Sequence, residues 1–437
     1  MGIKPSIYNT VSIQKDGRVA DAKTAAVSIA FYEDILSPNI TAKIQIADVG
    51  GSTKVAGTNE PLALYEAMKI RGGESVDIDI EPNSDSTKGI KLTEPLYINT
   101  IENVIREGNK EIFKINLSSR SSFSNESSFV DQKYRADVKI SDHVKSITNN
   151  YLPSVSSRLE VDETSNNHGF MGNQRKPFDI LLNLASKSVY SQSETSNSAG
   201  FLYFETLDKV YFKAIDNLVK QSPKASFYYD ETSESSLTGT NNDLRIIRYE
   251  IIKNQNILSD MRKGAYSTSR RFFDPVSFNV TDRNFDFTGS QYEQQMNTLN
   301  DPLNPRDRSI AFDAFPLSQK PSKIITETFD RGTVTDEVTQ EESKYIDRYI
   351  SQRKVRYNSL FSQIISVLVP SNTNIHAGDV VECNLPKLNG SNTNSTYDFE
   401  QLSGKYLVKE VCHFFDTRGS YTSMKLVRDS FGFDTSR

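Results

Sequence analysis

Three short runs of mostly apolar residues, separated by turn residues, occupy the end of the chain. The first run, 380–385, follows a Gly-Asp turn and stops at Pro386. The second run covers 405–415, and the third covers 421–428 after a turn that contains Asp and Gly. Runs of this length, rich in Val, Tyr and Phe and bounded by turn residues, are typical of antiparallel strands.

The second of these runs is apolar on both of its faces, which a strand covered on one side only would not be. Strict alternation places Tyr406, Val408, Cys412 and Phe414 on one face and Leu407, Val411 and Phe415 on the other. We therefore expect this strand to lie inside something larger than its own barrel, such as the contact with a neighbouring subunit. The residues expected in a barrel core or an interface are Val380, Tyr406, Val408, Val411, Phe414, Tyr421 and Leu426.

Residues 1–118 show the same alternation of apolar and polar positions. Apolar residues alternate in 7–13, 27–31, 40–46 and 76–80, and the segments 96–104 and 111–117 flank a Glu-Gly-Asn turn as a hairpin does. Strands at this spacing favour a small barrel or a sandwich.

Residues 119–240 change to a helical period. In SDHVKSITNNYL, Ser141 is expected to cap a helix, and KPFDILLNLASKSVY begins its helix at Pro177. The apolar stripe expected on the second helix consists of Phe178, Leu181, Leu182, Ala185 and Val189. A hairpin of 201–204 and 210–212, followed by a short helix, completes a small α+β unit.

The expected second middle domain, 241–354, begins at the end of a polar linker, 231–243. The segment 245–258 fits a strand or a helix, 283–321 shows no period and favours long ordered loops, and a helix is expected over 341–360. The chain is therefore divided into a first barrel (1–118), two middle domains (119–240 and 241–354) and a second barrel (355–437). The expected fold class is α+β, mainly β.

Composition narrows the class of protein. A chain of 437 residues with 24 Phe and 20 Tyr can form several cores, and its net charge of −5 without a basic run argues against a dedicated nucleic-acid binder. Cys383 and Cys412 are too few for a disulfide scaffold and are expected as free buried thiols. The first residues carry no apolar signal, and no stretch is long enough to span a membrane, so synthesis and folding in a cytoplasm are expected.

No motif of catalysis, cofactor binding or metal binding stands out. The Gly-rich pieces at 48–51 and 71–73 lack the Lys-Ser/Thr ending of a phosphate-binding loop and are interpreted as turns. His376, Cys383, Cys412 and His413 lie in one region, but their spacing matches no zinc signature. The remaining histidines, His143 and His168, have no G-x-S-x-G sequence beside them. We expect no enzyme, no cofactor and no metal.

Three segments resemble the central baseplate hub protein of contractile-tail phages of the T-even type. They are EDILSPNITAKIQIAD with GGESVDIDI, then KPFDILLNLASKSV with GFLYFETLDKVYFKAIDNL, and finally NTNIHAGDVVECNLP with GKYLVKEVCHFF and SYTSMKLVRD. Together they cover about half of the chain, and they occur in the order found in the hub family.

The resemblance implies a homotrimer in which each chain contributes two tube-type antiparallel β-barrels. The pseudo-sixfold ring would adapt the threefold central spike to the sixfold tail tube around the DNA channel. Implied partners are the spike, tail tube or tube-initiator proteins, the tape measure protein and the baseplate wedge proteins, with no membrane and no sequence-specific nucleic acid. The implied location is the virion tail baseplate, after assembly in the host cytoplasm. Two alternatives stay open: a tail-associated lytic enzyme, and the hub of a phage-derived injection or secretion machine.

Overall fold

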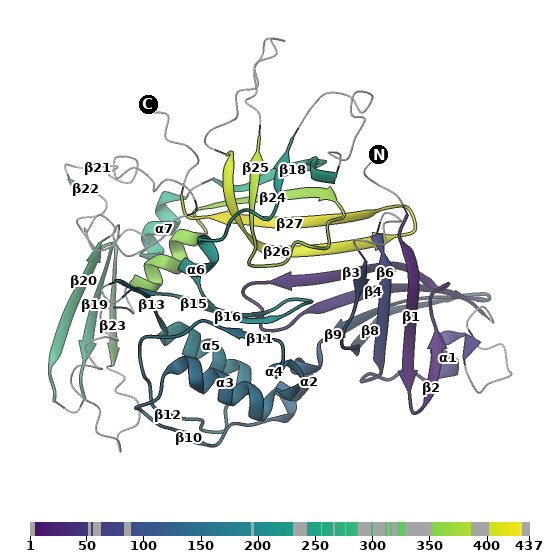
Figure 1. Ribbon diagram of the computed structural model, residues 1–437, viewed down its shortest axis with the longest axis horizontal. Helices are drawn as coiled ribbons and strands as arrows, with labels where there is room; N and C mark the ends of the chain where they lie inside the picture. Colours follow the sequence, from purple (N-terminus) through teal and green to yellow (C-terminus); the bar gives the residue numbers. More distant parts are fainter. Residues whose placement is uncertain are drawn as a thin grey trace, which may run out of the picture.

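The computed structural model describes residues 5–50, 54–55, 63–82, 89–193, 196–229, 243–254, 256–264, 267–275, 277–286, 299, 311–312, 315–316, 321–328, 349, 352–385 and 402–430. Within these residues, a 15-stranded sheet runs through two barrels, and the fold is mainly β with large antiparallel sheets, as predicted. Figure 1 shows the first barrel in purple and blue, the second in green and yellow, and a helical unit below them.

The first barrel is built from residues near the N-terminus. Its elements are β1 (Ile7–Lys15), β2 (Arg18–Asp21), β3 (Ala26–Asp34), β4 (Thr41–Val49), β5 (Lys54–Val55), α1 (Leu64–Met68), β6 (Ser75–Glu81), β7 (Ile90–Lys91), β8 (Leu96–Glu107) and β9 (Lys110–Ser118). The alternating apolar residues point inward, as Val11, Ile13, Ile44, Ile46 and Ile78 do in one common core.

The second barrel takes strands from three parts of the chain. They are β17 (Ser226–Tyr228), β18 (Arg248–Asn254), β24 (Gln363–Pro370), β25 (Val380–Asn384), β26 (Gly404–Asp416) and β27 (Ser420–Arg428). The barrel closes where Ile246 N–H donates to Tyr228 O over 2.8 Å. The predicted range 355–437 therefore lacks two of the barrel's strands, because β17 and β18 precede it in the chain.

Both barrels have the same strand order. Apart from the short β2, β5 and β7, the first barrel runs β3-β4-β9-β8-β6-β1 and the second runs β18-β24-β27-β26-β25-β17. If each set is numbered along the chain, both orders are two-three-six-five-four-one. The first strands differ in direction, since β1 is antiparallel to β6 whereas β17 is parallel to β25. The two barrels thus share one strand order, and their assignment to the tube type stays a prediction.

The middle unit packs helices against a small sheet. Its elements are α2 (Arg120–Ser127), β10 (Lys133–Tyr134), α3 (Ile140–Tyr151), α4 (Pro153–Ser156), β11 (Leu159–Val161), β12 (Phe170–Met171), α5 (Pro177–Lys187), β13 (Val189–Ser193), β14 (Ser196–Ala199), β15 (Phe201–Glu205), β16 (Val210–Ala214) and α6 (Ile215–Val219). The predicted hairpin and its following helix are confirmed as β15, β16 and α6.

Three details of the middle unit differ from the prediction. The N-cap of α3 is Lys139, and Ser141 lies inside the helix. Helix α5 ends at Lys187, so Val189 belongs to a strand, while Leu182 is exposed on the outer face. The buried stripe instead includes Ile180 and Leu184, because α5 presents a wider apolar face than the one we assigned.

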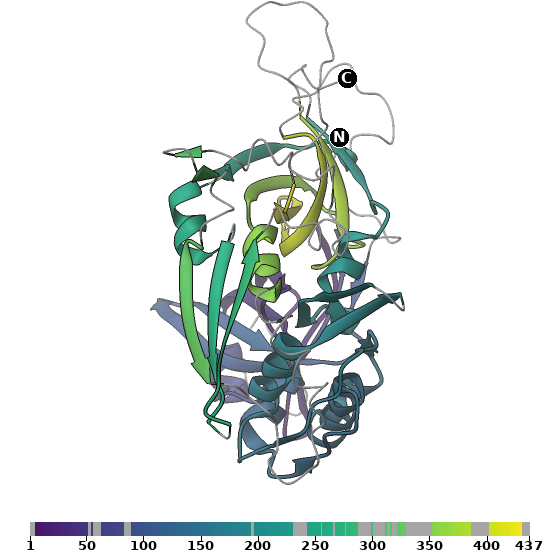
Figure 2. The ribbon, with the colours of Figure 1, turned by 90° about the vertical axis from the view of Figure 1, so that its left-hand side faces the viewer.

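The residues after 241 form a strand, a helix and a separate sheet. The ambiguous segment 245–258 holds β18 and the start of α7 (Ile257–Lys263), and β19 (Ser267–Phe273) lies between β20 (Val280–Asp286) and β23 (Lys323–Thr328). Figure 2 shows this three-stranded sheet turned toward the viewer. A short pair, β21 (Ala311–Phe312) and β22 (Phe315–Pro316), follows.

Two predictions for this region fall largely outside the described residues. Most of the loops expected over 283–321 lie there, as does most of 341–351, whereas residues 352–360 are helical as expected. In this helix, the buried Arg356 bonds Asp216 at 3.2 Å and Asp429 at 2.6 Å, which ties it to α6 and to the end of β27. None of the described helices combines the length and the apolar character needed to cross a membrane.

Candidate functional site

Strand β26 belongs to both barrels and joins them into one sheet. Its first part pairs with β25, from Cys383↔Gly404 to Val380↔Leu407. Its last seven residues pair with β3, from Glu410↔Asp34 to Asp416↔Ser28. A single strand with two successive partners on the same edge fixes the two barrels relative to each other through backbone hydrogen bonds. We take this junction as the candidate functional site.

A β-bulge separates the two parts of β26. The register against β27 shifts between Val408 and Glu410. Because a bulge adds one residue, the side chains beyond it change faces. Val411 therefore lies with Tyr406 and Val408 in the core of the second barrel. The strict alternation predicted for this strand is wrong from Glu410 onward.

Beyond the bulge, β26 contributes to the core of the first barrel. Phe415 is fully buried there and meets Phe31 edge-on, with ring centroids 6.1 Å apart. Tyr8 Oη of β1 donates to Phe415 O over 3.1 Å, and Ser6 N–H donates to Asp416 O over 3.2 Å. The end of β26 thus lies between β1 and β3 as part of the first barrel's wall.

The outer face of β26 is covered by the same chain. Leu407 and Val380 pack in one cluster with Phe204 of β15 and Ile35, which follows β3. The sequence suggested a neighbouring subunit as one cover for this face, but within the described residues the cover is the middle hairpin. Leu426 lies in the core of the second barrel, whereas Phe414 and Tyr421 face each other across the ladder and are partly exposed.

A tight turn of the second barrel packs against the hairpin formed by β15 and β16. Residues His376 to Asp379 fold back so that the His376 N–H donates to Asp379 Oδ2 over 2.7 Å. Gly378 has φ +88°, and a Cβ at this position would lie 2.7 Å from the ring of Phe204. Glycine is therefore required here both by the backbone conformation and by the close approach of the hairpin.

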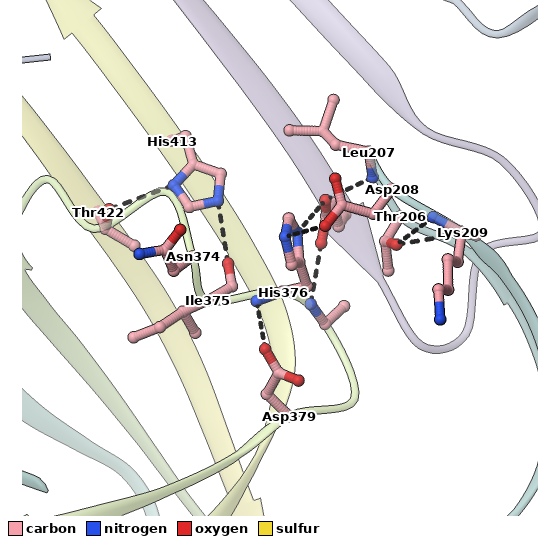
Figure 3. Close-up of polar contacts among 12 residues, drawn as sticks. Thr206, Leu207, Asp208, Lys209, Asn374, Ile375, His376, Asp379, His413 and Thr422 are labelled. Carbon is pink, nitrogen blue, oxygen red and sulfur yellow. Dashed lines mark hydrogen bonds and ion pairs between the residues drawn. The ribbon is translucent and has the colours of Figure 1, made fainter. Parts of the chain in front are cut away.

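A buried carboxylate links three parts of the chain at this turn. Figure 3 shows the surroundings of this carboxylate, with His376 beside Leu207 and Asp208. Glu33 of β3 accepts hydrogen bonds from Leu207 N–H at 2.8 Å and from Ala377 N–H at 2.9 Å. Its Oε1 also lies 3.0 Å from His376 Nδ1, and the other ring nitrogen of His376 lies 3.1 Å from Asp208 Oδ2. The first barrel, the β15–β16 turn and the second barrel meet at these residues.

The positive charge of His376 and the negative charges of Glu33 and Asp208 stabilise one another. Burial alone would lower the pKa of His376, but the hydrogen bonds that its ring donates to Asp208 and Glu33, with the charges of both carboxylates, outweigh burial and raise the pKa to about 10. Burial would raise the pKa of Glu33, yet the bond and charge of His376 and the backbone donor of Leu207 bring it below its usual value. His376 is therefore a buried imidazolium held between two carboxylates.

The neighbouring His413 is neutral, unlike the charged His376. It is fully buried, and its ring nitrogens lie 3.1 Å from Ile375 O and 3.2 Å from Thr422 Oγ1. Burial lowers the pKa of His413 to about 4, and the nearby His376 cation also lowers it. A neutral His413 thus packs beside a charged His376.

This cluster holds backbone in place and has no nitrogen free for proton transfer. Both oxygens of Glu33 and both ring nitrogens of His376 are occupied, whereas a general base must reach the proton that it removes. Among the described residues, no group of three or more His, Cys, Asp and Glu side chains could hold a metal ion. Cys383 and Cys412 are free cysteines.

Sequence reasoning named His376 only as part of a rejected zinc site. It missed Glu33 and Asp208, which lie 343 and 168 positions earlier in the chain than their common partner. The HAGD turn is a local signal for the position of His376, but no local pattern indicates which distant carboxylates reach it.

A search of curated proteins connects the chain with a phage protein. The probable baseplate hub protein gp334 of Vibrio phage KVP40 is 22% identical over 300 residues, which is 67% of this chain and 66% of that protein. The chain is thus similar to a phage baseplate hub protein. The match spans slightly less than two thirds of the length of this hub protein, and no family model matches the chain.

Solved structures of tail proteins share the fold. The tail protein of Neisseria meningitidis MC58 aligns with a TM-score of 0.53 and 10% identity, covering 97% of each chain. The 43 kDa tail protein of prophage MuSo2 from Shewanella oneidensis aligns with a TM-score of 0.52 and 8% identity, covering 98% of this chain and 100% of that one. The predicted resemblance to the hub family and the predicted mainly β fold are confirmed.

Proposed function

We propose that this protein is the structural hub of a contractile-tail baseplate. Three copies would form a ring that adapts a threefold central spike to a sixfold tail tube around the DNA channel. The observation that carries the proposal is the pair of barrels with one strand order, joined in one sheet by β26 and β3. The named baseplate hub relative supports the same role.

The duplicated barrel explains how three copies of one chain can contact both a threefold spike and a sixfold tube. If each chain presents two equivalent barrels, three chains present six positions around one axis. A closed ring of this kind requires a fixed angle between the barrels of each chain. The seven paired residues of β26 and β3, together with the Glu33–His376 cluster, supply that rigidity.

The proposed partners follow from this role. Besides its own copies, the hub would contact the central spike, tail tube or tube-initiator proteins, the tape measure protein and baseplate wedge proteins. Its place would be the virion tail baseplate, after assembly in the host cytoplasm. A negative net charge of −5 suits a wall past which DNA moves, because phosphate binding depends largely on Lys and Arg.

Native mass spectrometry of the purified chain tests the oligomeric state. The proposal expects a particle of three chains, each of 49.2 kDa. A particle of one, two or four chains over the micromolar range would contradict it.

A purely structural role is part of the proposal. Purified protein should release no soluble fragments from peptidoglycan. Saturable hydrolysis that disappears when one Asp or Glu is replaced would favour the lytic enzyme instead.

A further inference from the structure

Strand β19 presents one arginine to each face of the three-stranded sheet. Arg271 lies on the outer face, where it is 56% exposed and pairs with Asp282 at 2.8 Å. Arg270 lies on the inner face and is 2% exposed. Thr268, two positions earlier, shares this inner face and is paired in the sheet with Lys323 of β23. The inner face therefore carries buried positive charge.

Arg270 has an incomplete set of partners for a buried cation. Its Nη1 lies 2.6 Å from Oε2 of Glu327, a carboxylate that is itself 39% exposed. Among the described residues, the buried Nε of Arg270 has no hydrogen-bond partner, and neither has the buried hydroxyl of Thr268. A buried donor without an acceptor is costly, so this face of the sheet has room in its hydrogen bonding for a further acceptor.

The helix 352–360 brings two more cations to the same place. Arg353 of this helix donates to Ser186 O at the end of α5. Burial lowers the pKa of Arg353, and the charge of Arg270 lowers it further. Burial lowers the pKa of Lys354 as well, with the charge of Arg270 again contributing. The helix and the inner face of the sheet thus place like charges near one another.

The two lysines have no carboxylate of their own. Neither Lys323 nor Lys354 forms an ion pair within the described parts of the chain, and the charge of Lys323 also lowers the pKa of Lys354. The acidic side chain that opposes this shift is Glu327, which Arg270 already engages. We call these four residues the cation cluster: Arg270, Lys323, Arg353 and Lys354.

We propose that the cation cluster binds one oxyanion of the phosphate class between the inner face of the sheet and the helix 352–360. Oxygens of the anion would accept hydrogen bonds from Nε of Arg270 and from the ammonium groups of Lys323 and Lys354. Arginine and lysine are the side chains that proteins use for phosphate, and an anion between like charges removes their repulsion.

The bound anion would fasten the three-stranded sheet to the body of the protein. The helix 352–360 is already tied to α6 and to the end of β27 through Arg356. An anion shared by this helix and the sheet would extend that connection to β19 and β23. The inference stands apart from the proposed hub role, so its failure would leave that role untouched.

Calorimetric titration of the full chain with inorganic phosphate, at pH 7 and constant ionic strength in chloride, tests the binding. Lys354→Gln is the test variant because Lys354 is partly exposed and has no ion pair to lose. Arg271→Gln is the matched control, since it removes one positive charge from the outer face of the same sheet.

The wild type and Arg271→Gln should each bind one phosphate per chain. Lys354→Gln should bind phosphate about tenfold more weakly, the effect of losing one hydrogen bond to a charged group. Absence of saturable heat in the wild type, or equal affinity of the two variants, would overturn the inference.

Hydrogen exchange distinguishes an anion site from a merely structural lysine. Phosphate at roughly twenty times its dissociation constant should slow exchange of 267–273 and 323–328 about twentyfold in the wild type. Without phosphate, Lys354→Gln should exchange no faster than the wild type, because it removes a repelled cation. Faster exchange of that variant would overturn the inference.

The source of the phosphate group is tested in the same assay. Because Arg270 is 2% exposed, a small free ion should reach it and a nucleic-acid backbone should not. Single-stranded DNA at an equal concentration of phosphate groups should therefore give no protection. Protection by DNA and none by inorganic phosphate would overturn the inference.

Discussion

Removing the Glu33 carboxylate is the sharpest test of the junction between the barrels. In Glu33→Ala, the N–H groups of Leu207 and Ala377 lose their acceptor, and the buried His376 cation loses one of its two carboxylates. A buried donor without a partner costs about 1–3 kcal/mol, and breaking a buried ion pair costs about 3–5 kcal/mol. We therefore expect local opening of the junction to become easier by about 3–5 kcal/mol.

Hydrogen exchange measured by mass spectrometry reads this opening directly. Peptides that contain 205–210 and 374–379 should exchange roughly a hundred to a few thousand times faster, since each 1.4 kcal/mol is a factor of ten. Asp34→Asn is the matched control on the next residue of β3, where the carboxylate lies 3.3 Å from Lys409 and is 30% exposed. Loss of such a pair costs about 0–1 kcal/mol. Equal exchange in the two variants would refute the role given to Glu33.

Three further predictions concern pH, the second core and the cysteines. Because the pKa of His376 is raised from 6.5 to about 10, its stabilising contribution is complete below pH 6.5 and is lost as the pH rises through 10. The protection of amides at the junction, taken relative to the intrinsic exchange rate at each pH, should therefore fall over that range, and constant protection would contradict the charged state. Val408 is fully buried, so Val408→Asp should abolish soluble folded protein, because an unpaired buried charge costs several kcal/mol. Phe414 is partly exposed, so Phe414→Asp should keep a protease-resistant fold. Equal effects of the two variants would contradict the change of faces at the bulge. Burial raises the thiol pKa of Cys383 to about 12 and that of Cys412 to about 11, so both should resist maleimide at pH 8 until the protein is denatured, and rapid native labelling of Cys383 would disprove its burial.

Many strands and helices of the fold can be predicted from local sequence patterns. The runs 380–385, 405–415 and 421–428 became β25, β26 and β27 with ends within one or two residues, because turn residues mark their limits. The pattern on KPFDILLNLASK likewise identified α5. Periodicity and turn chemistry act over a few residues, which is why they succeed for such elements.

The features that local patterns missed depend on distant partners. Nothing in the short segments 226–228 and 248–254 shows that they complete a barrel with strands more than a hundred positions later. The bulge after Val408 reversed the expected faces because alternation cannot reveal an added residue. Local sequence patterns could not identify the partners of His376 either, because only the fold brings the distant Glu33 and Asp208 to it.

A three-dimensional reconstruction of the purified particle by electron microscopy tests the central claim most directly. We expect three chains around one axis, with six barrels arranged as a pseudo-sixfold ring about an open channel. A particle without threefold symmetry, or a trimer whose two sets of barrels lie at different distances from the axis, would contradict the account.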